Sequence, residues 1–346
     1  MEYKCCGFLN HGIQFLHDKI TVCSQVSHIG GGNIVLWESY KDKKMDIDEI
    51  IRKKKDILNY VKQGNVYPNC EGCTDLKDWN SENAPSDKLK LLMIQHWTKC
   101  NSNCIYCYTA KDKKWYNSFR HYKIMPILEE MLKKDELDKN GLANFSGGEF
   151  TLLDEADKIV KLLSKLNYFI IVNSSGVDYS RVLADRIKKG NSCVIISVDA
   201  GTEEVHRKIK RVKTYKKVWK NIKRYAENQA KPYLVNVKFI IVPGYNDTKE
   251  EIEQWLMNCV AAKVHVIVLG IDANYFEPNR ENIPDRIFDL FRWTKDKAES
   301  LGLKFTIGNR ALTMLTQGKY ADPYWDNYRF DDGEYSVLYF QEHYLK

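Results

Sequence analysis

Apolar and polar positions alternate along the central part of this chain in a repeating strand-and-helix pattern. Short runs rich in Val, Ile and Leu are each followed by a longer segment in which apolar residues recur at helical spacing. The pattern predicts six strands in succession, at 89–95, 142–146, 168–173, 193–199, 233–242 and 264–271. The helices that follow them are predicted at 121–134, 154–166, 179–189, 214–228, 247–260 and 285–301.

This alternation predicts an α/β fold built on a parallel sheet, because continuous apolar strands need helices on their faces. Six units are too few to close an eightfold barrel, so we expect a partial (β/α)6 TIM-like barrel over 89–303. A polar linker at 81–88 is expected to separate it from a small Cys-rich domain, 1–80, with one helix at 47–61. We expect the aromatic-rich extension, 304–346, to cover the barrel opening.

Composition narrows the classes of partner. The formal net charge is +7, and the lysines are spread along the chain, which favours a solvated surface over a nucleic-acid-binding face. No apolar run approaches the roughly 20 residues that a membrane-spanning helix needs. The first residues lack the basic-then-apolar pattern of a signal peptide, so we expect a cytoplasmic protein without a membrane partner.

The cysteines change the picture most. Eight of the ten lie within the first 107 residues, and without an export signal they are expected to be metal ligands or core residues rather than disulfides. Cys193 and Cys259 lie in apolar stretches and are expected to pack in the core.

The loop after the first predicted strand of the barrel carries the strongest chemical signal. Cys100, Cys104 and Cys107 have the spacing C-x-x-x-C-x-x-C. Three thiolates so close together can hold one side of an iron–sulfur cubane and leave one iron open to a small molecule. Zinc is the alternative, with His96 as a fourth ligand.

The stretch CNSNCIYCY resembles the signature of the radical S-adenosylmethionine (radical SAM) superfamily, with Tyr106 just before the third cysteine. The likeness extends from about Leu89 to Leu303. It includes a Gly-Gly-Glu motif after the second strand and a Ser-x-Asp-x-Gly-Thr stretch, 197–202, after the fourth.

This resemblance implies a [4Fe–4S] cluster on the three cysteines, with SAM bound to its open iron. An electron donor such as flavodoxin or ferredoxin would reduce the cluster, and SAM would be cleaved to methionine and a 5′-deoxyadenosyl radical. That radical would abstract hydrogen from an unidentified substrate, either a small molecule or sugar, or a peptide. The alternative is a non-enzymatic iron–sulfur or zinc protein for electron transfer or binding, but it would have no use for the Gly-Gly-Glu motif.

The resemblance also implies which residues contact SAM. Gly147 and Gly148 allow a close backbone approach, and Glu149 or its backbone accepts from the SAM ammonium. The other expected contacts are Tyr106 and Val242 at the adenine, Asn173, Ser175, Ser197 and Asp199 at the ribose, and Arg207 or Arg211 at the carboxylate. Capping of the next helix is the alternative for Ser197 and Asp199, and a surface position is the alternative for the arginines.

A second group of cysteines lies near the start of the chain. Cys70 and Cys73 form a CxxC pair, and Cys23 with either Cys6 or Cys5 completes a four-thiolate set. The segment is similar to the SPASM or twitch auxiliary-cluster domains of some radical SAM enzymes, although those usually follow the barrel. The similarity implies one second [4Fe–4S] cluster, with zinc as the alternative metal.

Overall fold

The computed structural model describes residues 2–23, 34–39, 45–73, 76–80, 87–107, 122–272 and 284–308. Most of the linker predicted at 81–88, and nearly all of the extension predicted at 304–346, lie outside these ranges.

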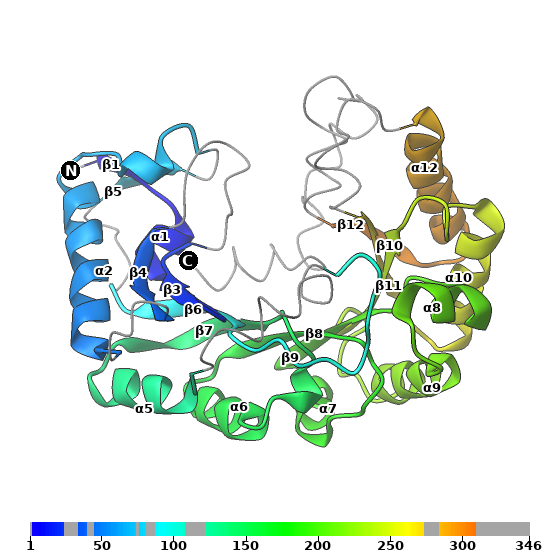
Figure 1. Cartoon of the computed structure of the whole chain (residues 1–346), viewed down its shortest axis with the longest axis horizontal. Helices are drawn as coiled ribbons and strands as arrows, with labels where there is room; N and C mark the ends of the chain where they lie inside the picture. The colour runs from blue at the N-terminus through cyan, green and yellow to red at the C-terminus, as the bar shows by residue number, and fades with distance from the viewer. Residues whose placement is uncertain are drawn as a thin grey trace.

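The centre of the molecule is a curved, open sheet whose strands run parallel (Figure 1). Seven of its strands are, in chain order, β6 (Leu89–Gln95), β7 (Leu137–Phe145), β8 (Phe169–Ser174), β9 (Ser192–Ser197), β10 (Val235–Ile241), β11 (Val266–Ile271) and β12 (Lys304–Ile307). Each strand pairs with the next one along the chain. The predicted partial barrel of the α/β class is therefore confirmed, with β12 as an additional strand beyond the six predicted.

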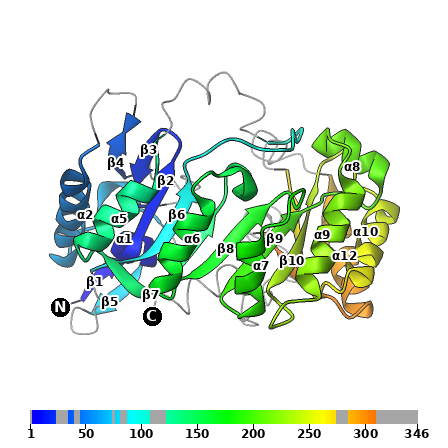
Figure 2. The same ribbon diagram turned by 90° about the horizontal axis from the view of Figure 1, so that it is seen from below.

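Helices cover the convex side of this sheet, as the views from two directions agree (Figures 1 and 2). They are α5 (Met125–Lys133), α6 (Ala156–Lys165), α7 (Arg181–Lys188), α8 (Glu203–Lys210), α9 (Tyr215–Ala226), α10 (Lys249–Ala261) and α12 (Asp285–Ser300). Helix α10 begins where its sequence indicates, because the Thr248 hydroxyl accepts from the N–H of Glu251 at 3.3 Å. Helix α8 is an element that the sequence did not predict as separate.

The first 80 residues add strands to the same sheet. They contain β1 (Glu2–Cys5), α1 (Gly7–His11), β2 (Gly12–Leu16), β3 (Lys19–Thr21), β4 (Val35–Glu38), α2 (Ile47–Lys62), a 3-10 turn η2 (Pro68–Cys70) and β5 (Lys77–Asn80). Strand β2 pairs parallel with β6, and β3 and β4 follow in antiparallel order. The described sheet thus has ten strands, in the order β12-β11-β10-β9-β8-β7-β6-β2-β3-β4.

The strands of the first segment therefore continue the barrel sheet, a long-range pairing that local periodicity does not reveal. Among the described strands, β1 and β5 alone form a sheet of their own, antiparallel and two-stranded. The domain boundary at 81–88 stays a prediction.

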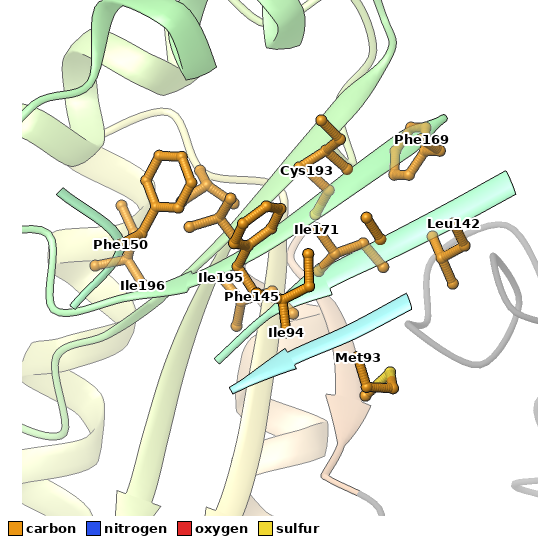
Figure 3. Close-up of a cluster of buried hydrophobic side chains, with 14 of the residues drawn as sticks. Met93, Ile94, Leu142, Phe145, Phe150, Phe169, Ile171, Cys193, Ile195 and Ile196 are labelled. Atoms are coloured by element: carbon orange, nitrogen blue, oxygen red, sulfur yellow. The ribbon is translucent and has the colours of Figure 1, made fainter. Parts of the chain in front are cut away.

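The core lies between the sheet and its helices, and Figure 3 shows part of it. Ile94, Phe145 and Val172, on three neighbouring strands, are each 0% exposed. Phe145 meets the ring of Phe150 edge to face at 5.2 Å between centroids. Cys193 is 2% exposed within this cluster, so its predicted packing role is confirmed.

No described helix has the length and apolar composition needed to span a bilayer.

Candidate active site

The loop that carries Cys100, Cys104 and Cys107 leaves the carboxyl end of β6, near the middle of the sheet. Cys100 is exposed, while Cys104 and Cys107 are half-buried. The N–H of Cys107 donates to the carbonyl of Cys104 at 3.1 Å, which closes a tight turn around the last two cysteines. The carboxyl ends of parallel barrel strands are where such folds carry their sites.

The far end of the loop is held by helix α8. The N–H groups of Asn103 and Ile105 donate to the carbonyls of Lys210 and Ile209, both at 3.0 Å. These carbonyls belong to the last turn of α8, where no intrahelical donor is left for them. The cysteine loop therefore takes its position from the segment that follows β9.

The near end of the loop is held by the Gly-Gly-Glu turn after β7. The N–H of Gly148 donates to the carbonyl of Trp97 at 2.9 Å, and that of Glu149 donates to Lys99 at 2.8 Å. Gly147 has a φ of +97°, and a Cβ on Gly148 would lie 2.4 Å from the Trp97 ring. Both glycines thus allow this turn to pack closely against the cysteine loop, in addition to any role in binding a ligand.

The Glu149 side chain ties this turn to the end of β8. It is 2% exposed, and its carboxylate accepts from the Ser174 hydroxyl at 2.8 Å and the Ser175 N–H at 2.7 Å. The Thr151 hydroxyl donates to the same carboxylate at 3.1 Å. With these partners the carboxylate is already satisfied, so the backbone around Glu149 is the part that remains for an ammonium group.

Residues after β8 also contact the cysteine loop. The Ser175 hydroxyl donates to the Asn101 side-chain oxygen at 2.9 Å, and the Asn101 amide donates to Asp178 at the same distance. Asn173 donates to Asn144 at 3.0 Å and to the carbonyl of Phe145 at 3.2 Å. Asn173 and Ser175 are both half-buried at the strand end where the sequence predicted them.

Asp199 has a different environment from the one expected at a ribose. It is 0% exposed and has a φ of +58°, and its carboxylate accepts from the Lys210 ammonium, the Tyr106 hydroxyl and, at 2.8 Å, the Ile240 N–H. Tyr106 thus contacts Asp199 from the cysteine loop, and Lys210 contacts it from α8. The three side chains join the cysteine loop, the segment after β9 and helix α8, and the Ile240 N–H links them to β10.

Charge explains why this cluster is stable in a buried place. Burial alone lowers the pKa of Lys210, but the Asp199 carboxylate and then the Cys104 sulfur raise it, and the net direction is upward. Lys210 is therefore a cation, and it lies within electrostatic range of both Cys100 and Cys104. Burial raises the pKa of the Cys104 thiol, and Lys210 opposes that effect.

The remaining predicted SAM contacts are distributed less compactly. Ser197 is half-buried at the end of β9, and neither it nor Asp199 caps α8, because the N-cap of α8 is Thr202. Arg207 and Arg211 are exposed, which agrees with the surface alternative. Val242 is 5% exposed, and its N–H donates to the Asn246 side chain at 2.7 Å.

Sequence reasoning missed Lys210 and Asn246. The Asn246 amide donates to the carbonyls of Asp199 at 2.9 Å and Ile240 at 2.8 Å, which fixes the ends of β9 and β10 together. Neither residue lies in a motif that periodicity or spacing singles out. The one available signal for Lys210 was its position at the end of a short helix that follows the rim residue Asp199.

The N-terminal cysteines lie on separate segments, with Cys5 and Cys6 at the start of α1, Cys23 after β3, and Cys70 and Cys73 in and after η2. Cys5 and Cys6 are buried, and Cys23, Cys70 and Cys73 are half-buried. Cys6 lies within electrostatic range of Cys23, Cys5 and Cys70, and Cys70 lies within range of Cys73. The Cys6 Sγ also caps α1, because it accepts a hydrogen bond from the Leu9 N–H at 3.3 Å. Burial raises the pKa of Cys5 to about 11 and raises that of Cys6 further, so both are neutral thiols without a metal.

Within the described ranges no three His, Cys, Asp or Glu side chains are arranged around one metal position. Thiolates that hold a cubane each bind a different iron, so they need not share such a position. His96, weighed above as a zinc ligand, packs its ring against Trp97 and Tyr122, with centroids 5.5 Å away in each case.

Comparison with known proteins identifies the barrel region. Residues 94–259 match the family model of the radical SAM superfamily. The GTP 3′,8-cyclase of Clostridium botulinum is 26% identical over 173 residues, which cover 49% of this chain and 52% of the cyclase. The same-named enzyme of Clostridium perfringens is 28% identical over 174 residues, which cover 48% and 50%. This chain therefore spans about half the length of the curated relatives it matches.

Solved structures show the same fold. Streptococcus suis SuiB bound to S-adenosylmethionine superposes with a TM-score of 0.53 at 13% identity, covering 86% of this chain and 63% of SuiB. SuiB bound to its precursor peptide SuiA also gives a TM-score of 0.53 at 13% identity, covering 78% of this chain and 55% of SuiB. The family model confirms the resemblance of residues 94–259 to the radical SAM superfamily. The similarity of residues 1–80 to SPASM or twitch domains stays a prediction.

Proposed function

We propose that this chain, whose residues 94–259 belong to the radical SAM superfamily, is an enzyme that cleaves S-adenosylmethionine reductively. The 5′-deoxyadenosyl radical formed in this way would abstract hydrogen from a substrate. One observation carries the proposal. Three rim segments that the sequence singled out, after β7, β8 and β9, all contact the loop of Cys100, Cys104 and Cys107 through hydrogen bonds.

The residues present fit a [4Fe–4S] cluster. Cys100, Cys104 and Cys107 would bind three irons and leave the fourth open, and Lys210 places a positive charge beside two of these sulfurs. When bound, the cluster supplies the electron that breaks the sulfonium carbon–sulfur bond of SAM. A low-potential protein such as flavodoxin or ferredoxin would supply electrons to it.

This chain's own residues would then hold SAM. The backbone of Gly147, Gly148 and Glu149 lies beside the cysteine loop and is proposed to receive the ammonium of SAM. We keep as further proposed SAM-binding residues Tyr106 on the cysteine loop, Arg207 on α8 and, at or after the strand ends, Asn173, Ser175, Ser197, Asp199 and Val242. Asp199 would act through Tyr106 and Lys210 rather than by direct contact.

A second cluster is proposed at the N-terminal cysteines. Cys23, Cys70 and Cys73 with Cys6, or Cys5 in its place, would supply four thiolates, so every iron would have a protein ligand. The electrostatic interactions of Cys6 with Cys23 and Cys70, and of Cys70 with Cys73, support this assignment. With no open iron, the centre would transfer electrons or stabilise the fold rather than bind SAM.

Polar side chains on the concave face of the sheet favour a polar substrate. Gln95, Asn144 and Asn173 each neighbour one of the fully buried residues Ile94, Phe145 and Val172, so they point to the opposite face, away from the covering helices. Gln95 donates to the Ser146 hydroxyl at 2.6 Å. Gln14, on β2, donates to the Gln95 side-chain oxygen at 3.1 Å, which extends the polar row across β6.

Such a polar row suits both proposed substrate classes, a small molecule or sugar and a peptide. The similar proteins named above include one of each kind, a GTP 3′,8-cyclase and a SuiB structure with a bound precursor peptide. Hydrogen transfer from substrate candidates of both classes to 5′-deoxyadenosine, followed with deuterated compounds, would assign the class.

The direct test of the proposed function is SAM cleavage by the full chain after anaerobic reconstitution with iron and sulfide. With dithionite and SAM, the chain should produce 5′-deoxyadenosine and methionine, measured by liquid chromatography. Cys100→Ala, Cys104→Ala and Cys107→Ala should each abolish this product, because a three-ligand site has no ligand to spare. Cys193→Ala is the matched control and should keep it. Failure of the iron-loaded wild-type chain to form 5′-deoxyadenosine would overturn the proposal.

A further inference from the structure

Lys54 is a buried lysine on α2 whose ammonium reaches the carboxyl-terminal part of α1, the helix whose N-cap is Cys6. It is 6% exposed, and its ammonium donates to the carbonyls of Leu9 at 2.8 Å and Asn10 at 3.4 Å. Over the described residues no carboxylate forms an ion pair with it. Asp87 acts on it electrostatically but pairs with Lys62 at 2.5 Å instead. Lysine is almost never buried so deeply without a negative partner.

Capping of α1 explains only part of this arrangement. The two carbonyls lie near the carboxyl end of α1, where they lack intrahelical donors, and they account for two of the three N–H donors of the ammonium. They do not neutralise its charge, and burying an unpaired charge is costly. A neutral amide donor would satisfy such carbonyls without that cost.

The groups around Lys54 are sulfurs. Cys5, Cys6 and Cys23 all lie within electrostatic range of its ammonium, and Cys5 lies within range of Cys70 as well. They come from three segments that are distant in sequence, namely the β1–α1 junction, the second residue after β3 and the η2 turn. As thiols these groups are neutral, but as ligands of a metal they are thiolates.

We propose that Lys54 is the built-in counter-charge of an anionic metal–thiolate centre at the N-terminal cysteines, and that it sets the reduction potential of that centre. The inference rests on the second cluster of the proposed function. Four thiolates outweigh the positive charge of an oxidised cubane core, so the centre is anionic, and one electron from the low-potential donor makes it more so. The fixed ammonium stabilises the reduced state more than the oxidised one.

The test uses the full chain with Cys100→Ala, Cys104→Ala and Cys107→Ala combined, so that only the N-terminal centre is loaded. Two quantities are then measured in this parent chain and in its Lys54→Gln and Lys54→Arg variants. They are the iron content and the reduction potential of the N-terminal centre, from a potentiometric titration followed by electron paramagnetic resonance. Lys54→Gln keeps a donor for the two carbonyls and removes the charge, whereas Lys54→Arg keeps both. Lys55→Gln, one residue along α2 and exposed, is the matched control for loss of one positive charge.

Lys54→Gln should lower the ratio of reduced to oxidised cluster at a fixed potential about tenfold, which is about 59 mV for one electron. Lys54→Arg and Lys55→Gln should keep the ratio of the parent. If Lys54→Gln loses iron altogether, retention of iron by Lys54→Arg supports the counter-charge, and loss in both variants overturns it. An unchanged ratio in an iron-loaded Lys54→Gln chain also overturns it, and leaves the second cluster standing. Absence of iron from the parent variant overturns the second cluster itself.

Discussion

Breaking the buried ion pair between Lys210 and Asp199 should destabilise the protein far more than breaking an exposed pair on the same helix. The two side chains are 3% and 0% exposed, and removal of one partner from such a pair costs about 3–5 kcal/mol. Lys210→Met leaves the carboxylate with the Tyr106 hydroxyl and the Ile240 N–H, so we expect a cost of about 3 kcal/mol. Asp199→Asn leaves the ammonium with the Tyr106 oxygen at 2.9 Å, so we expect about 5 kcal/mol.

The double variant separates the ion pair from the packing of its side chains. Lys210→Met with Asp199→Asn removes both charges, so its cost should be about 3 kcal/mol, well below the sum of the single costs. The assay is urea unfolding of the cluster-loaded chain followed by circular dichroism, with equal slopes required for the comparison. The control is Lys208→Met, which breaks the exposed pair with Glu204 and should cost less than about 1 kcal/mol. Additive costs in the double variant would refute the coupling.

Two further predictions concern the rim and the N-terminal segment. Gly148→Ala should displace the cysteine loop, because the new Cβ would meet the Trp97 ring at 2.4 Å. Iron content after reconstitution should fall relative to Gly270→Ala, whose new Cβ would meet Lys238 and Ile240 only at the ordinary distances of 3.8 and 3.9 Å. Equal iron content in the two variants would contradict the packing argument. For His11, burial lowers the pKa from 6.5 to about 4, and its Nδ1 and Nε2 are bonded to the Lys88 carbonyl and the Asn10 amide, which favours the neutral ring. The unfolded chain therefore binds more protons in this range, so the stability due to His11 is complete above pH 6.5 and is lost as pH falls toward 4. Urea midpoints measured against pH should show a weaker acid dependence in His11→Gln, and an identical dependence would contradict the burial of a neutral ring.

The central fold could be predicted from the sequence because its signals are local. Strand β6 has the bounds that its apolar run predicted, 89–95, and α12 differs from its prediction by one residue. Apolar periodicity depends only on residues a few positions apart, so it survives without knowledge of the tertiary structure. The three-cysteine spacing is equally local, and it indicated the superfamily on its own.

Pairings between distant segments were decided only by the tertiary structure. Strand β2 has only five residues, and nothing in its sequence specifies β6 as its partner. Asp199 ends its strand just as a ligand-binding residue would, but Lys210 and Tyr106 turn its carboxylate inward. A short polar side chain after a strand has the same sequence pattern whether it meets a ligand or a neighbouring loop, because the difference lies in which long-range partner is close enough to bond.

The same reason applies to Lys54. In the sequence it is one of three consecutive lysines on an amphipathic helix, and only the packing of α2 against α1 buries the middle one beside the N-terminal cysteines. The sequence by itself determined which elements form and which thiols are available. The tertiary structure decided which charges lie beside those thiols, because burial and electrostatic contact depend on distances in space that residue order does not contain.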